Sequence, residues 1–97
     1  MTQQEFTHVL LYTYVADMLE RRVPYREEHL ERIQALRAAD RLIVAGAFGD
    51  PPAGAIIGIR GLTRAEVEAW ADTDPYVTAG LVVERSVEPW NLVQGSR

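Results

Sequence analysis

The order of apolar patterns along this chain restricts its fold more than any other feature of the sequence. Segments rich in β-branched and aromatic residues alternate with segments whose apolar residues recur at helical spacing. Their order predicts strand, helix, strand, strand, helix, strand, with no internal repeat or low-complexity linker. We therefore expect one α+β domain in which four strands form a single sheet and both helices cover one of its faces.

Turn and capping signals give the expected bounds of these elements. Pro24 suits the first turn of the first helix, whereas a capping box, Thr63-x-x-Glu66, opens the second helix and Pro75 should close it. The segment GDPPAG predicts a turn between the middle strands. The single domain spans 1–97, with a core of about 6–93 and a polar tail at 94–97. We expect strands at 6–14, 42–48, 55–60 and 82–93, the last with a break at Pro89. A polar connector is expected at 17–23 and the first helix at 25–39.

This order is that of the ferredoxin-like βαββαβ fold, in which one face of the sheet has no helices. Yet the segments 42–48 (LIVAGAF) and 55–60 (AIIGIR) are nearly continuous apolar runs, which is typical of strands buried on both faces. Large exposed apolar patches are unfavourable, and two-fold interfaces commonly cover them, so we expect a homodimer. The alternative is that long side chains and the C-terminal segment cover this face alone.

Composition argues against several classes of function. The 97 residues contain no cysteine, and all ten basic residues are arginine, which excludes disulfides, thiol nucleophiles and lysine Schiff bases. A net charge of −4 without a dense basic cluster argues against nucleic acid as a partner. The absence of cysteine fits a reducing cytoplasm, where we expect this protein, and no apolar run approaches the roughly 18 residues of a membrane helix, so we expect no membrane contact. Neither a nucleophile-elbow serine nor a dinucleotide-binding glycine motif is present.

The first helix carries polar residues on its apolar side. On a helical wheel, Leu30, Ile33 and Leu36 define the inner face. Arg26 and His29 lie within about 40° of the centre of that face, so both are expected to point inward near the start of the helix. A core histidine bonded to a backbone carbonyl, and an arginine that extends to solvent, would explain the same pattern without any function.

The second helix repeats this pattern, because Asp74 falls on its apolar side. The two helices run antiparallel in this fold, so the start of one lies beside the end of the other and His29 should approach Asp74. A carboxylate next to an imidazole fixes the ring tautomer, as in a general acid or base. Arg26 would hold a substrate anion nearby. Simple helix termination at Asp74-Pro75 is the alternative.

At these residues the chain resembles the YCII-related domain family of small dimeric α+β proteins. The matching motifs are Arg26-x-x-His29, Leu36-x-x-Ala39-x-Arg41-Leu42-x-x-Ala45-Gly46 and Asp74-Pro75-Tyr76-x-x-Ala79-Gly80-Leu81, followed by Pro89-Trp90. The resemblance covers roughly residues 6–93 and implies a dimeric α+β barrel with a His-Asp active-site pair at His29 and Asp74. It also implies a relation to enzymes that act on aromatic breakdown products. Asp40 departs from the family, where glycine is frequent.

Together these features predict a small cofactor-free enzyme, a lyase or isomerase, in which His29 transfers a proton and Asp74 orients it. Arg26, Tyr76 and Tyr12 are the expected binding residues for a small anionic or aromatic-derived molecule. No metal site is expected, and His8 is expected to have a cross-strand or core role. Two alternatives stay open: a non-catalytic small-ligand binding or interaction module on the same dimeric fold, and a barrel related to muconolactone isomerases or monooxygenases with its polar groups elsewhere.

Overall fold

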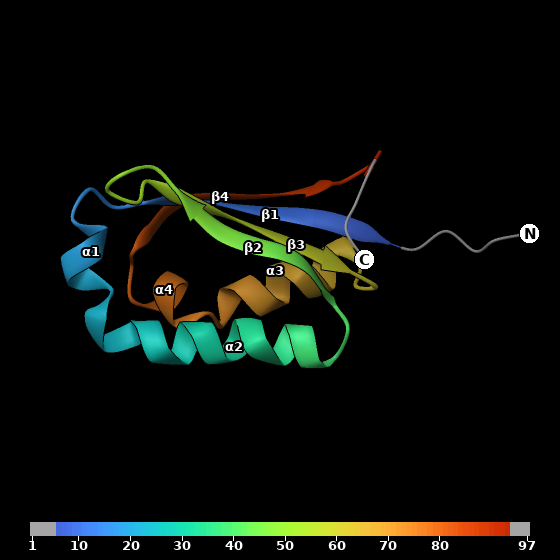
Figure 1. The fold of residues 1–97 in the computed structure, drawn as a ribbon, viewed down its shortest axis with the longest axis horizontal. Helices are drawn as coiled ribbons and strands as arrows, with labels where there is room; N and C mark the ends of the chain where they lie inside the picture. The colour runs from blue at the N-terminus through green and yellow to red at the C-terminus, as the bar shows by residue number, and fades with distance from the viewer. Residues whose placement is uncertain (1–5, 94–97) are drawn as a thin grey trace, which may run out of the picture.

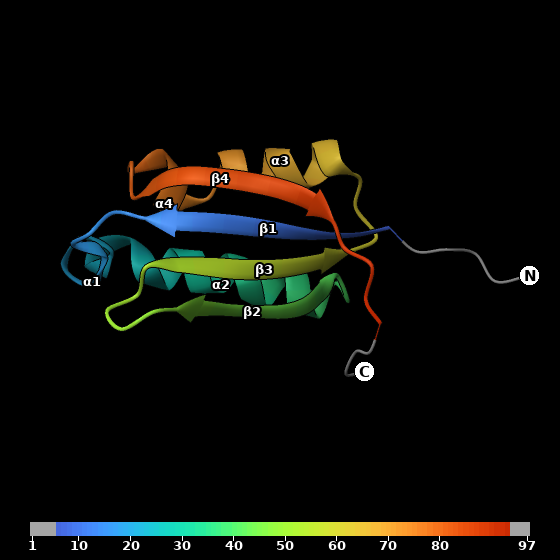
Figure 2. The same cartoon turned by 90° about the horizontal axis from the view of Figure 1, so that it is seen from above.

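The part of the chain that the structure describes folds into a four-stranded antiparallel sheet with its helices on one face. The computed structural model describes residues 6–93. The strand order is β2-β3-β1-β4, and Figures 1 and 2 show the helical layer on one side and uncovered strands on the other. The predicted α+β class and element order are confirmed. The elements are β1 (Thr7–Tyr14), α1 (Met18–Arg21), the 3-10 turn η1 (Val23–Tyr25), α2 (Arg26–Ala38), β2 (Leu42–Phe48), β3 (Gly54–Arg60), α3 (Arg64–Asp72), α4 (Pro75–Thr78) and β4 (Val82–Pro89).

The connector after β1 is more ordered than predicted. The segment 17–23 contains α1 and the start of η1, because Met18 turns inward and is buried within the core. Pro24 lies in η1, directly before α2, where its fixed backbone angle suits a tight turn. The sequence did not predict this short helix because the segment is mostly polar. A single buried methionine gives no repeated apolar spacing that would indicate a helix.

The second predicted helix is divided into two. Thr63 caps α3 as predicted: its backbone N–H donates to Glu66 Oε1 at 2.8 Å, and the Glu66 N–H donates to its hydroxyl at 3.2 Å. However, α3 already ends at Asp72, and Pro75 begins α4 instead of only closing α3. Proline is favoured in the first turn of a helix because it lacks the N–H that would stay unpaired there. The chain therefore turns between α3 and α4, at the position of Asp74.

The end of the chain departs from the prediction in a simpler way. β4 ends at Pro89, so residues 90–93 do not continue the strand as expected. Proline removes the N–H that the sheet would use, which explains the end point. The predicted polar tail at 94–97 lies outside the described residues.

The core lies between the sheet and the helical layer. Alternate residues of β1 point toward the helices, and Leu10, Tyr12 and Tyr14 are buried there. They pack with buried apolar residues of β3, α3 and β4, and each fully buried aliphatic side chain contributes about 1.5–3 kcal/mol to folding. This packing fixes the aromatic residues of β1 next to the turn between α3 and α4.

The N-terminal half of α2 does not pack on this core as predicted. Leu36 is buried, whereas Ile33 is only half-buried and Leu30 is 45% exposed. The helical wheel gave the correct direction for these side chains, since Leu30 and Ile33 both face a cavity. A helical wheel gives the direction of a side chain, but it does not distinguish a packed neighbour from an open space.

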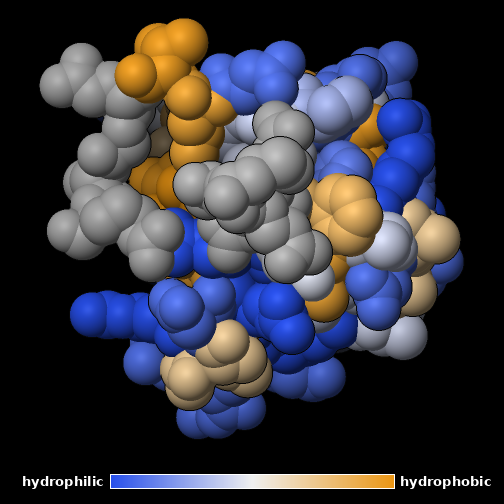
Figure 3. All heavy atoms as spheres, turned by 90° about the vertical axis from the view of Figure 1, so that its right-hand side faces the viewer, coloured by the Kyte–Doolittle hydropathy of each residue, from blue (hydrophilic) through white to orange (hydrophobic). Residues whose placement is uncertain are grey.

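The sheet face opposite the helices carries exposed apolar side chains. Val44, Phe48 and Ile56 are 48%, 49% and 37% exposed. Trp90 covers Gly58, where any side chain would overlap the indole ring, so the C-terminal segment covers part of this face but not all of it. Seen from one end, hydrophilic side chains occupy most of the helical side, and hydrophobic ones gather more on the sheet side (Figure 3).

We predict that a second copy of the chain covers this sheet face. Light scattering at micromolar concentration should give twice the mass of the 10.9 kDa chain. Ile56→Asp should yield a monomer, because it would place a charge in a desolvated interface. Leu19→Asp is the matched control, since Leu19 is another exposed apolar residue and belongs to α1, in the helical layer. A monomeric wild type, or an Ile56→Asp variant that stays dimeric, would contradict this prediction.

Candidate active site

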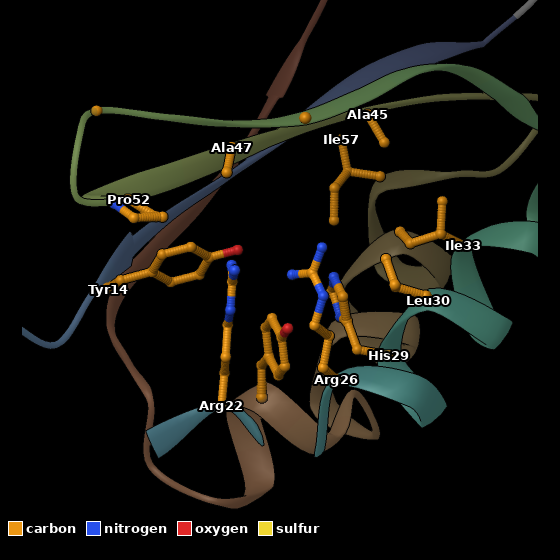
Figure 4. A pocket seen from close by; sticks show the side chains of 13 residues that line it. Tyr14, Arg22, Arg26, His29, Leu30, Ile33, Ala45, Ala47, Pro52 and Ile57 are labelled. Atoms are coloured by element: carbon orange, nitrogen blue, oxygen red, sulfur yellow. The ribbon is translucent and has the colours of Figure 1, made fainter. Parts of the chain in front are cut away.

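A cavity of about 420 Å³ lies between α2, the α1–η1 turn and the β2–β3 hairpin (Figure 4). Its volume is sufficient for a small molecule. One part of the wall is apolar and the other carries cationic and phenolic groups, with no carboxylate among the described lining residues. The lining residues are Tyr14, Arg22, Arg26, His29, Leu30, Ile33, Ala45, Gly46, Ala47, Gly49, Pro52, Ile57 and Tyr76.

The structure brings His29 and Asp74 together, as the helical wheels predicted. His29 Nδ1 lies 3.0 Å from Asp74 Oδ1 and 3.1 Å from Asp74 Oδ2, and both residues are buried. Because an ionised carboxylate only accepts hydrogen bonds, the neutral imidazole must carry its proton on Nδ1. Nε2 is then the basic nitrogen, and it has no hydrogen-bond partner among residues 6–93. This geometry suits proton transfer, although the catalytic role stays a prediction.

Asp74 is fixed by donors from several elements. Tyr12 of β1 donates its hydroxyl hydrogen to Oδ2 at 2.8 Å, and the backbone N–H of Tyr76 donates to Oδ1 at 3.0 Å. Asp74 is thus the N-cap of α4 as well as the partner of His29. Burial by itself would raise the pKa of Asp74, but the hydrogen bonds from His29, Tyr12 and Tyr76 outweigh it and hold the pKa below its ordinary value. The carboxylate is therefore ionised at neutral pH.

Tyr12 lies behind this carboxylate and not at the cavity wall. It is 1% exposed, and its hydroxyl donates to Asp74, so it is placed to position that carboxylate, and its role in substrate binding stays a prediction. Its position has a geometric reason: β1 places both Tyr12 and Tyr14 on the helical side, but only Tyr14, one pleat further, reaches the cavity.

Tyr76 connects three parts of the site. Its ring stacks on the His29 imidazole, with centroids 3.9 Å apart and planes 7° from parallel, and Tyr14 contacts it edge-on at 6.0 Å. Its hydroxyl is buried at the cavity, and no described group makes a well-formed hydrogen bond to it. Burial raises the pKa of Tyr76, while the nearby charges of Arg26 and Arg22 oppose that rise, so the phenol is a proton donor at neutral pH.

Two arginines reach the cavity, and the sequence indicated only one. Arg26 begins α2 and lines the cavity as predicted, with part of its side chain exposed to solvent. Arg22 was missed because it lies between α1 and η1, where no helical periodicity indicates a direction. The labelled side chains in Figure 4 show both guanidinium groups extending toward the middle of the cavity.

The remaining candidate groups lie elsewhere. His8, on β1, is half-buried, and its Nδ1 has no hydrogen-bond partner in the described chain. It lies beside Trp90 and Phe6, in a surface hollow separate from the cavity. Within residues 6–93, no group of three or more histidine, aspartate or glutamate side chains is arranged to hold a metal ion, and no helix is long and apolar enough to cross a membrane.

The Tyr12 phenol is predicted to link stability to alkaline pH. Burial first, and the Asp74 charge second, raise the pKa of Tyr12 above 10.0. As the pH rises, the unfolded chain therefore loses the Tyr12 proton before the folded chain does. The contribution of Tyr12 to the free energy of unfolding is fully present below pH 10, and it should fall by up to about 1.4 kcal/mol per pH unit above pH 10. Urea unfolding across this range should show a shallower decline in Tyr12→Phe. Tyr25→Phe, at an exposed tyrosine, should keep the wild-type slope, and equal slopes in all three proteins would refute the prediction.

Solved structures share this fold at low sequence identity. A 5-chloro-2-hydroxyhydroquinone dehydrochlorinase from Burkholderia phenoliruptrix, in complex with 2,5-dihydroxybenzoquinone, superposes with a TM-score of 0.75 at 22% identity, over 88% of this chain and 93% of that one. A candidate antibiotic biosynthesis monooxygenase from Nitrosomonas europaea gives 0.54 at 16% identity, over 96% of each chain. At these identities the likeness establishes the fold alone.

Sequence relatives are closer. Protein YciI of Escherichia coli O6:H1 is 39% identical over 87 residues, which is 80% of this chain and 89% of the relative. An uncharacterized protein of Haemophilus influenzae is 33% identical over 95 residues, or 89% of this chain and 97% of the relative. The model of the YCII-related domain matches residues 6–91. The chain therefore belongs to the YCII-related domain family.

Proposed function

We propose that this protein is a small enzyme of the lyase or isomerase type, in which His29 transfers a proton to and from a small anionic, aromatic-derived substrate. The observation that carries the proposal is the Nδ1 contact of His29 with a buried carboxylate at 3.0 Å, which leaves Nε2 as the basic nitrogen of a residue that lines a cavity. A histidine held in this way is suited to act as a general base.

The proposed reaction begins with removal of a proton from substrate. Nε2 of His29 takes a proton from a carbon next to a carbonyl, and the electron pair of the broken C–H bond moves to the carbonyl oxygen, which gives an enolate. Asp74 stabilises the resulting imidazolium, as the carboxylate of a catalytic triad does. Arg26 and the Tyr76 hydroxyl stabilise the new oxyanion. The imidazolium then returns its proton at another position, which gives an isomer. Alternatively, the electron pair expels a leaving group as an anion and the imidazolium gives up its proton to that group or to water, which gives an elimination product.

The comparisons support a substrate class without identifying a substrate. The structural neighbour from Burkholderia acts on a chlorinated hydroxyhydroquinone and binds a dihydroxyquinone. Hydroxylated and halogenated aromatics and lactones are therefore the first molecules to screen, with 2,5-dihydroxybenzoquinone as a probe of binding. The scheme uses only protein side chains and requires no cofactor.

A binding module without catalysis is the second candidate. The observation that favours it is the pair of cavity arginines next to the buried Tyr76 hydroxyl, which would hold an anion without any proton transfer. The two candidates share the cavity and the fold, and they differ only in whether His29 changes its protonation state during a cycle.

His29→Gln should separate these candidates. If His29 is the general base, turnover of a substrate found by screening should fall by roughly 10² to 10⁴, while its affinity changes only a few fold. Asp74→Asn should lower turnover less, because it removes orientation and imidazolium stabilisation and leaves the proton carrier. His8→Gln is the matched control: the chain has two histidines, and His8 lies outside the cavity. A substrate that His29→Gln converts at the wild-type rate would exclude the proposed role.

A further inference from the structure

The cavity has a charge opposite to that of the whole protein. The chain carries a net charge of −4, yet Arg22 and Arg26 both line the cavity, and no carboxylate lies among its described lining residues. Ion pairs within residues 6–93 engage Arg21, Arg60 and Arg85, but neither cavity arginine. Two unneutralised guanidinium groups at one site repel each other and attract anions.

Two phenols add hydrogen-bond donors to the same part of the wall. Tyr76 is 2% exposed, and its hydroxyl is buried without a well-formed partner in the described chain, an arrangement that is unfavourable unless a ligand accepts the hydrogen bond. Tyr14 lines the cavity beside it. Both phenols have raised pKa values, chiefly because of burial, and both feel the charges of Arg22 and Arg26. The four groups therefore form one cluster.

Apart from His29, the rest of the wall is apolar. Leu30 and Ile33 of α2 face Ala45 and Ile57 of the sheet across the cavity (Figure 4). A ligand that satisfies both regions has an apolar body and its acidic oxygens at one end. We infer that the cavity selects compact organic dianions, and that Arg22 is the residue that recognises the second negative charge. This inference rests on the cavity being a ligand site, as the proposed function requires, but it does not depend on catalysis.

The backbone of Arg22 is held in place by hydrogen bonds on both sides. Its backbone N–H donates to the Met18 carbonyl at 2.9 Å, and its carbonyl accepts from the Tyr25 N–H at 2.8 Å. Met18 is buried and anchors α1 to the core. Its neighbour Arg21 instead lies within 3.7 Å of Asp17 on the exposed side of α1. The two adjacent arginines thus form a matched pair for substitution, with the same change of charge inside and outside the cavity.

Calorimetric titration of the full chain, above neutral pH, tests the inference without any turnover. The probes are three dianions, phthalate, isophthalate and phenyl phosphate, and the monoanion benzoate. The wild type should bind at least one of the two dicarboxylates about tenfold more tightly than benzoate, which corresponds to about 1.4 kcal/mol. Arg22→Gln should remove that preference and leave benzoate affinity within a few fold. Arg21→Gln should retain the preference.

Several outcomes would overturn the inference. These are equal or weaker binding of both dicarboxylates relative to benzoate, and an Arg22→Gln variant that loses affinity for monoanion and dianion alike. Tighter binding of phenyl phosphate than of either dicarboxylate, with the same loss in Arg22→Gln, would support the dianion class and would show that one phosphate group supplies both charges. If Arg22→Gln does not fold by circular dichroism, Arg22→Lys replaces it: the charge is kept, so the preference should survive, and its complete loss would count against charge recognition. Loss of turnover in His29→Gln leaves these binding results unaffected, so the two proposals fail separately.

Discussion

The site depends on one buried carboxylate. Asp74 is fully buried, and the removal of a charge from water costs several kcal/mol unless donors replace the lost hydration. Here the donors come from three different elements: the hydroxyl of Tyr12 on β1, the ring of His29 on α2 and the backbone N–H of Tyr76 on α4. No single element would satisfy this charge. The carboxylate is therefore stable only when the sheet and the helices are correctly placed against each other. Asp74 thus depends on the packing of the whole helical layer, and it is also a catalytic candidate.

The same hydrogen bonds determine the chemistry that the cavity can support. With its Nδ1 proton committed to Asp74, the His29 ring has one fixed orientation, and Tyr76 stacks on the ring while its own N–H caps the carboxylate. The arrangement of these groups therefore depends on the chain at the start of α4, where Asp74 and Tyr76 are two residues apart. The negative charge of Asp74 is paired with His29 behind the histidine ring, so arginines are the charged residues that line the cavity.

The sequence predicted the parts of the site that lie on regular elements. His29 and Arg26 stand on α2, and Asp74 follows α3, so helical periodicity and the antiparallel arrangement of the helices were sufficient to bring His29 and Asp74 together. Arg22 escaped prediction because it lies in an irregular turn, where no period gives a direction. Strand alternation correctly predicted that Tyr12 lies on the helical face of the sheet, but it could not predict that the Tyr12 hydroxyl contacts Asp74. Whether this hydroxyl reaches the cavity or Asp74 depends on how the helices pack on the sheet. The element order was predictable for the same reason as the pair, because strands and long helices carry periodic signals that four-residue helices lack.

The edge strand β2 connects the cavity with the uncovered face of the sheet. Ala45 and Ala47 point into the cavity, and the alternating residues Val44 and Phe48 point to the opposite face, where they are about half exposed. Within the described chain, β2 pairs only with β3, so one of its edges has no hydrogen bonds to a neighbouring strand. This part of the cavity wall therefore has fewer hydrogen bonds to neighbouring strands than a central strand would have. Any surface that packs against Val44 and Phe48 would therefore also stiffen the strand that carries Ala45 and Ala47, and this coupling makes the predicted interface relevant to ligand binding as well as to stability.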